Sequence, residues 1–161
     1  MTNKTLIAYF SYTEHTRGIA KLIQSIIGAE LFEIRPAAPY SDDYDTCEAQ
    51  ARKETSKGYQ PSLEAMCENL QDYDTILLGT PNWFNTVAPP VAAFLSESDL
   101  SGKTLIPFCT NGGGGLGHIV NDIKKMCGGA EVREALSLYE DGGADAKSKI
   151  TEWLNKNQYS F

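Results

Sequence analysis

The strongest indication of the fold is the stretch Thr5-Leu-Ile-Ala-Tyr-Phe-Ser-Tyr-Thr-Glu-His-Thr16 near the N-terminus. Its first six residues are almost wholly apolar, and a short run of β-branched and aromatic residues is typical of a strand buried on both faces. After Thr16 the apolar residues Ile19, Leu22, Ile23, Ile26 and Ile27 follow the spacing of one helix face. Gly28 is the expected end of that helix. The stretch therefore predicts a strand, a polar loop and a helix in direct succession.

The same alternation continues along the chain. Further strands are expected at residues 30–34, 74–79, 103–109 and 130–138, and further helices near residues 89–95, 116–127 and 145–155. Pro89 and Pro90 suit a helix start, because proline is tolerated in the first turn. Five strand–helix alternations imply an α/β fold, a doubly wound five-stranded parallel sheet with helices on both faces. We expect a single domain over residues 1–161.

The connection between Tyr40 and Leu70 has a weaker pattern. Tyr44, Cys47 and Ala51 can line one face of a helix that ends near Gly58. Residues 63–70 suit a second, short helix. This region is interpreted as an elaborated connection and not as a second domain, and the sequence leaves its role open.

Composition and charge exclude several classes of protein. The 161 residues are 42% hydrophobic and carry a net charge of −7. So acidic a surface argues against nucleic acid and against anionic membranes as partners. No apolar stretch reaches the ~20 residues that span a bilayer, and no signal peptide is visible, so we expect a cytoplasmic protein. The four cysteines are widely spaced and expected to be reduced, and the two histidines have no metal-ligand spacing, so no metal is expected.

Three polar loops, at residues 11–16, 80–86 and 110–117, follow predicted strands. In an open α/β sheet such loops meet at the carboxyl edge, where ligands bind. The first loop places hydroxyl groups beside a helix N-terminus, an arrangement that suits a phosphate group. The alternative is ordinary helix capping, since Ser11-x-x-Glu14 also fits a capping box.

The second and third loops suit the flat part of a ligand. Trp83 and Phe84 lie between turn-forming residues, where an aromatic ring can stack on a heterocycle or can simply cover the core edge. The third loop has five glycines in the six positions from Gly112 to Gly117. Glycine lets the backbone approach a ligand closely, although the loop can also be a mobile connection. The spacing differs from G-x-G-x-x-G, so no dinucleotide fingerprint is predicted.

These residues together resemble the flavodoxins, and most closely the bacterial flavodoxin-like proteins whose third-strand loop reads Pro-x-Trp. The matching segments are Ala8-Tyr9-Phe10-Ser11, Pro39-Tyr40 with Asp43-Tyr44, Pro81-Asn82-Trp83, and Ser101-Gly102-Lys103-Thr104 leading to Pro107-Phe108-Cys109-Thr110. The resemblance covers nearly the whole chain. It implies the strand order 2-1-3-4-5 and noncovalent binding of FMN.

The resemblance also implies a set of cofactor-binding residues and no catalytic acid or nucleophile. Around the phosphate it places Ser11, Thr13, Glu14, His15 and Thr16. Beside the isoalloxazine it places Pro81, Asn82, Trp83 and Phe84, with Trp83 as the stacking partner. Near the pyrimidine side of the ring it places Thr110, Asn111, Gly112, Gly113 and Gly115.

Two departures from the family pattern bear on this expectation. The family usually has Gly-Asn where this chain has Glu14-His15, and a carboxylate beside a phosphate weakens binding unless it points away. We therefore expect the Glu14 side chain to face solvent. The family also often has glycine after the tryptophan, where this chain has Phe84.

The first function we expect is that of an FMN-dependent electron carrier, a monomer or weak homodimer that meets a reductase and an acceptor protein. The acidic surface suits docking to basic partner sites. The alternatives are an NAD(P)H-dependent FMN oxidoreductase that reduces quinones, and a flavin-free module on the same fold.

Overall fold

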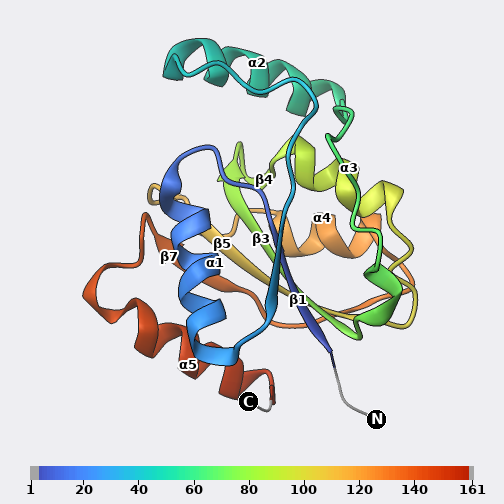
Figure 1. Ribbon diagram of the computed structural model, residues 1–161. Helices are drawn as coiled ribbons and strands as arrows, with labels where there is room; N and C mark the ends of the chain where they lie inside the picture. Colours follow the sequence, from blue (N-terminus) through green and yellow to red (C-terminus); the bar gives the residue numbers. More distant parts are fainter. Residues whose placement is uncertain (1–3, 160–161) are drawn as a thin grey trace.

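The structure, a computed structural model, describes residues 4–159. Strands and helices alternate along most of the chain (Figure 1). The strands are β1 (Thr5–Tyr9), β2 (Glu30–Glu33), β3 (Thr75–Trp83), β4 (Thr86–Val87), β5 (Thr104–Asn111), β6 (Glu131–Val132) and β7 (Leu136–Tyr139). The α-helices are α1 (Glu14–Ile27), α2 (Tyr44–Lys57), α3 (Pro89–Glu97), α4 (Ile119–Met126) and α5 (Ala146–Lys156). Short 3₁₀ turns span Leu70–Asp72 and Gly143–Asp145.

The sheet confirms the predicted class and strand order. Its order is β2-β1-β3-β5-β6, with β7 also paired to β5. All of these pairs are parallel, and Ala8 of β1 pairs with Phe32 of β2 on one side and Leu78 of β3 on the other. Because β6 and β7 lie along successive parts of β5, they are two halves of the predicted fifth strand.

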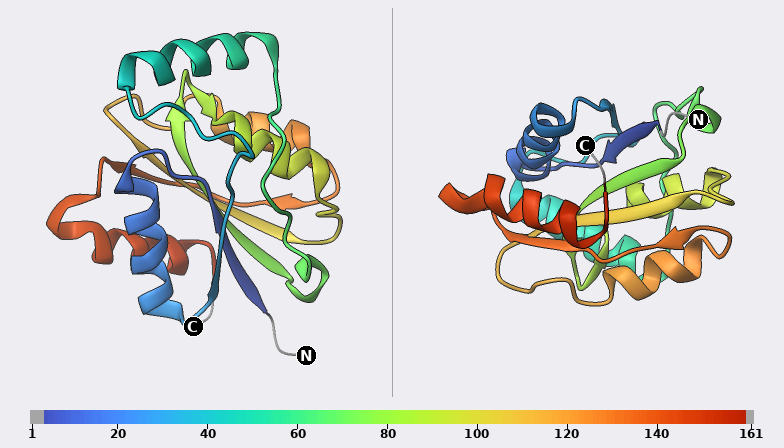
Figure 2. Two further views of the ribbon diagram at one scale, coloured as in Figure 1. Left: turned by 45° about the horizontal axis from the view of Figure 1, so that its top comes forward. Right: turned by 90° about the horizontal axis from the view of Figure 1, so that it is seen from below.

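Two hydrophobic cores lie on opposite faces of this sheet, because successive side chains of a strand point to opposite faces. On one face Ile7, Leu77 and Ile106 pack against α1 and α5, which contribute Ile19, Ile23, Ile150 and Leu154. On the other face Leu6, Ala8, Ile76 and Leu78 pack against α3 and α4, which contribute Val91, Phe94, Ile119 and Ile123. Figure 2 shows the two helix layers on either side of the sheet.

The fifth strand is interrupted, which the sequence did not predict. The backbone of Glu134 does not pair with β5, because Trp153 of α5 and Asn157, the residue after α5, supply its hydrogen-bond partners. The Glu134 N–H donates to the Asn157 Oδ1 at 3.0 Å. The Glu134 carbonyl accepts from the Trp153 indole and the Asn157 amide, each at 2.9 Å.

The third strand is longer than predicted, so residues 80–86 are a hairpin and not an open loop. Strand β3 continues through Trp83, because β4 pairs with it in the antiparallel register Asn82↔Val87 and Trp83↔Thr86. The hairpin thus carries Trp83 beyond the carboxyl edge of the parallel sheet.

The region between Tyr40 and Leu70 contains one helix, not two. Helix α2 ends at Gly58 as expected, and Cys47 and Ala51 are buried, whereas Tyr44 is 65% exposed. Leu63 forms an antiparallel bridge with Pro36, and the Glu64 N–H donates to the Arg35 carbonyl at 2.8 Å. This extended pairing replaces the predicted helix at residues 63–70. Figure 1 shows α2 beyond the carboxyl ends of the strands, above the β3–β4 hairpin.

No helix within residues 4–159 is long and apolar enough to cross a lipid bilayer. All four cysteines are free thiols; Cys47, Cys109 and Cys127 are buried, and Cys67 is half-buried.

Candidate functional site

The three predicted loops meet at the carboxyl edge of the sheet, and each contacts the other two. The hydroxyl groups of Thr16 and Thr110 are hydrogen-bonded at 2.8 Å, which joins the first loop to the third. The Tyr12 and Trp83 rings, 6.0 Å apart between centroids, join the first to the second. The Asn82 amide donates to the Gly115 carbonyl at 2.8 Å, which joins the second to the third. The predicted convergence is therefore confirmed.

The first loop leaves the start of α1 open. Thr13 is the N-cap residue, but its side chain makes no capping hydrogen bond. The Ser11 hydroxyl accepts from the Arg17 N–H at 3.1 Å and donates to the Thr13 carbonyl, so the Ser11–Glu14 capping box does not form. The backbone N–H groups of the first helical turn, at Glu14, His15 and Thr16, have no partners within the helix by geometry. This end of α1 is the natural anion site of the edge.

The Glu14 carboxylate points away from that anion site, as expected. Its side chain is 80% exposed, and it pairs with the Arg17 guanidinium at 2.5 Å. Arg17 also binds Glu33 of β2 at 2.8 Å. The Glu14 carboxylate, which departs from the family pattern, is therefore paired with a cation on the outer side of α1. The neighbouring His15 is half-buried.

Glu33 holds the start of α1 against the sheet. Its carboxylate accepts from Arg17, from Arg35 at 2.9 Å and from the Tyr9 hydroxyl at 3.0 Å. Burial alone would raise the pKa of Glu33, but the hydrogen bonds from Arg17, Arg35 and Tyr9 outweigh it and lower the pKa to about 2. Glu33 is thus charged whenever the protein is near neutral pH.

Trp83 is half-buried and is surrounded by aromatic rings. Phe10, Tyr12 and Tyr40 contact it edge-to-face, with centroid distances of 5.4, 6.0 and 5.2 Å. The sequence analysis assigned no role to Tyr12, and it named Tyr40 only within the family-like segment Pro39-Tyr40. The sequence signal for Tyr12 is its position as an aromatic residue between the hydroxyl residues of the first loop.

The hydroxyls of the two tyrosines beside Trp83 bind α2 and the segment that leads into it. The Tyr12 hydroxyl donates to the Ser41 carbonyl at 2.6 Å, and the Tyr40 hydroxyl donates to the Glu54 carboxylate at 2.6 Å. Burial, followed by the neighbouring Cys47 thiol, raises the pKa of Tyr12 to about 12. Burial and then Glu54 raise the pKa of Tyr40. Both side chains therefore remain neutral hydrogen-bond donors.

The hairpin turn fixes where Phe84 points. Phe84 and Asn85 have positive φ angles of 56° and 67°, as in the two-residue turns that match strand twist. Positive φ is unusual for a bulky residue. The Phe84 ring is 36% exposed and lies under the Arg52 guanidinium of α2, at 4.7 Å. Phe84 therefore lies at the hairpin tip and contacts α2. Pro81 and Asn82 lie earlier in β3 and are half-buried.

The third loop presents its backbone and not its side chains. The Asn111 amide donates to the Ser137 hydroxyl at 3.0 Å and to the Leu138 carbonyl at 3.2 Å, and its oxygen accepts from the Gly113 N–H at 2.9 Å. Its side chain thus shapes the loop. A Cβ atom at Gly112, Gly113 or Gly115 would meet nothing within 4 Å. The space over this loop is open to a ligand.

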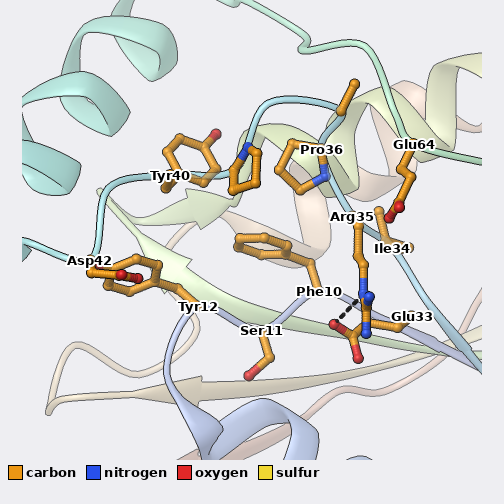
Figure 3. Close-up of a pocket in the computed structure, with 12 residues that line it drawn as sticks. Phe10, Ser11, Tyr12, Glu33, Ile34, Arg35, Pro36, Tyr40, Asp42 and Glu64 are labelled. Carbon is orange, nitrogen blue, oxygen red and sulfur yellow. Dashed lines mark hydrogen bonds and ion pairs between the residues drawn. The ribbon is translucent and has the colours of Figure 1, made fainter.

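Two cavities flank the meeting point of the loops. The first, of about 330 Å³, lies beside Ser11 under the segment from Arg35 to Asp42, with the Phe10 ring at its floor (Figure 3). Its lining carries the carboxylates of Glu33, Asp42 and Glu64, whereas its one guanidinium is already bound to Glu33. This cavity repels a phosphate group.

The second cavity, of about 270 Å³, lies between the hairpin and α2. Its walls are Tyr12, Asn82, Trp83 and Phe84 on one side and Tyr44, Cys47, Glu48 and Ala51 on the other.

The groups that meet at this edge of the sheet fit the parts of an FMN molecule. The N-terminus of α1 supplies uncharged N–H donors for a phosphate. Trp83 supplies a planar apolar surface, and the glycine loop supplies backbone that a ring edge can approach without a side chain in the way.

The comparisons with known proteins agree with this geometry. A sequence profile described as flavodoxin matches residues 4–157. The chain belongs to the flavodoxin family. A search among curated protein sequences finds no match.

Solved structures of similar fold include several flavoproteins. A provisionally assigned flavoprotein from Bacteroides eggerthii is 28% identical, with a TM-score of 0.87 over 99% of this chain and 100% of that one. A flavoprotein from Lactobacillus acidophilus, solved in complex with FMN, is 22% identical, with a TM-score of 0.76 over 94% and 99%. Oxidised flavodoxin 2 from Bacillus cereus is 22% identical, with a TM-score of 0.64 over 98% and 99%.

Proposed function

We propose that this flavodoxin-family protein binds FMN and carries electrons between a reductase and an acceptor protein. The observation that carries the proposal is the joint arrangement of three features at one edge of the sheet. These are the uncapped start of α1, the half-buried Trp83 and the open glycine loop. No single one of them indicates a flavin, but together they offer N–H donors for a phosphate and a planar surface and open backbone for a ring.

Each loop has a separate part in holding the cofactor. The N–H groups of Glu14, His15 and Thr16 hold the phosphate, and the Ser11, Thr13 and Thr16 hydroxyls lie around it. Trp83 stacks on the isoalloxazine, flanked by Pro81, Asn82 and Phe84. The backbone from Thr110 to Gly115 approaches the pyrimidine edge. FMN itself supplies the redox chemistry, while the protein governs its access and its electrostatic surroundings.

Charge around the site supports a carrier over an enzyme that uses a nicotinamide nucleotide. Glu48 lines the cavity under α2, and the exposed Asp42, Asp43 and Asp45 lie at or just before the start of the same helix. Nicotinamide nucleotides carry several negative charges, and these carboxylates repel them. The same carboxylates attract a basic docking surface on a partner protein.

The experiment compares direct and partner-mediated reduction. The FMN-loaded protein is mixed anaerobically with NADH or NADPH, and flavin bleaching is followed with and without an added flavodoxin reductase. We expect slow bleaching alone and fast bleaching with the reductase. Rapid direct bleaching with turnover of a quinone would show an NAD(P)H-dependent oxidoreductase instead.

A further inference from the structure

Helix α2 belongs to the part of the chain for which the sequence indicated no role, yet it forms one wall of the cavity beside Trp83. Its buried residues are Cys47 and Ala51, and it is anchored through Tyr40–Glu54 and through Arg52 over Phe84. These last two anchors lie in its C-terminal half. The N-terminal turn, which carries Tyr44, overhangs the carboxyl edge of the sheet (Figures 1 and 2).

Trp83 is surrounded by three rings but still has surface open to a stacking partner. Phe10, Tyr12 and Tyr40 already contact its indole, with interplanar angles of 86°, 72° and 80°. Trp83 still lines the cavity under α2, so part of its surface is open. A ring that enters that cavity can therefore stack on Trp83.

The size and the lining of the cavity match a ring system and not a whole nucleotide. Its volume of about 270 Å³ is below the ~300–1,000 Å³ typical of pockets that enclose a complete ligand. The walls from Tyr44, Cys47 and Ala51 are largely apolar, and Glu48 is the one charged side chain in the lining. The phosphate finds its donors outside, at the start of α1.

We infer that α2 is the fourth wall of the flavin site. The isoalloxazine lies between Trp83 and α2, and Tyr44 covers the outer end of the ring at the cavity entrance. Ala51 forms the inner limit, since its Cβ is buried against the same space. This inference rests on the proposed binding of FMN and extends the site beyond the three loops.

The first arm of the test narrows the cavity. Ala51→Leu adds a branched side chain to the inner wall of the cavity under α2. The control is Ala92→Leu, which makes the same change on α3, where Ala92 lines a different cavity. Dissociation constants for FMN and for riboflavin are measured by flavin fluorescence. Ala51→Leu is expected to weaken the binding of both flavins by at least about tenfold, because overpacking excludes the ring. Ala92→Leu is expected to leave both dissociation constants within about twofold of the wild-type values.

The second arm uses a surface residue, so it stays informative even if Ala51→Leu does not fold. Tyr44→Ala is expected to weaken FMN binding by about two- to tenfold and to raise the fluorescence of bound flavin, because one stacking ring is lost. Tyr59→Ala, at the other end of α2 and 54% exposed, is the matched control and should change neither.

The outcomes separate this inference from the proposed function. A wild-type protein that takes up no FMN overturns both. Wild-type binding together with unchanged affinity in Ala51→Leu and Tyr44→Ala overturns the fourth wall alone and leaves the site made by the three loops.

Discussion

Trp83 combines two roles because it is the last residue of β3. Its strand position lets the indole pack against Phe10, Tyr12 and Tyr40, and the hairpin carries the rest of the ring past the sheet edge. The sequence placed Trp83 in a loop and weighed stacking against covering the core. The structure has it covering the core edge while part of its surface still lines a cavity.

These two roles determine how Trp83 is best tested. Trp83→Phe keeps an aromatic face, whereas Trp83→Leu keeps apolar contact with the cluster and removes stacking. We expect Trp83→Leu to weaken FMN binding by about two- to tenfold and to raise bound-flavin fluorescence, with Trp83→Phe in between. A flavin fluorescence titration checks this. Equal affinity and quenching in all three proteins would assign Trp83 to packing alone.

Glu33 makes stability depend on acidity. Its pKa is lowered in the folded protein from 4.5 to about 2, so the stabilisation is complete above pH 4.5 and is lost as the pH falls toward 2. Glu33→Gln is expected to reduce the free energy of unfolding at neutral pH by an amount on the order of 3 kcal/mol, and to flatten its dependence on pH between those values. Urea denaturation at a series of pH values measures both. A pH profile identical to that of wild type would show that other carboxylates carry this dependence.

At the scale of elements, the hairpin interlocks with the end of the glycine loop and with the start of α4, which follows it. The His118 N–H donates to the Asn85 carbonyl at 2.6 Å, and the Thr86 hydroxyl donates to Asp122 at 2.5 Å. Gly117 has a φ of +51°, and a Cβ atom there would lie 2.7 Å from the Asn85 backbone. Glycine is required at this contact because the two backbones approach so closely.

Gly117→Ala is therefore expected to separate the hairpin from the loop. We expect the free energy of unfolding to fall by about 2 kcal/mol or more, which lowers the Tm by roughly 4–8 °C for a chain of this length, and FMN affinity to fall with it. Gly128→Ala is the control, because a Cβ there meets nothing within 4 Å and the residue lies outside the glycine loop. If both variants melt at the same temperature in a thermal scan, the interlock does not stabilise the site.

The elements that the sequence predicted well are those whose hydrogen bonds and apolar faces are local. Strand β1 and helix α1 follow from an apolar run, a helical period and Gly28. The elements that it missed depend on distant partners. Glu134 leaves the edge strand because of Asn157 and Trp153, and Leu63 is extended because Pro36 lies opposite. No local pattern carries that information.

At the scale of the molecule, the parallel sheet made the candidate site predictable in outline. Strand–helix alternation brings the carboxyl ends of β1, β3 and β5 to one edge, so the meeting of their loops followed from topology alone. The aromatic surround of Trp83 and the position of α2 did not follow, because they depend on how the connection from Tyr40 to Leu70 folds back over that edge. The net charge of −7 predicts only the sign of a partner surface.

The most direct test of the account is a titration of the purified, flavin-depleted protein with FMN and with riboflavin, followed by flavin fluorescence. Saturable quenching with one FMN per chain is the predicted result, and riboflavin should bind more weakly because it lacks the phosphate that the start of α1 holds. Equal affinity for the two would contradict the phosphate site. A protein that quenches neither flavin would contradict the central claim that the three loops and Trp83 form a flavin site.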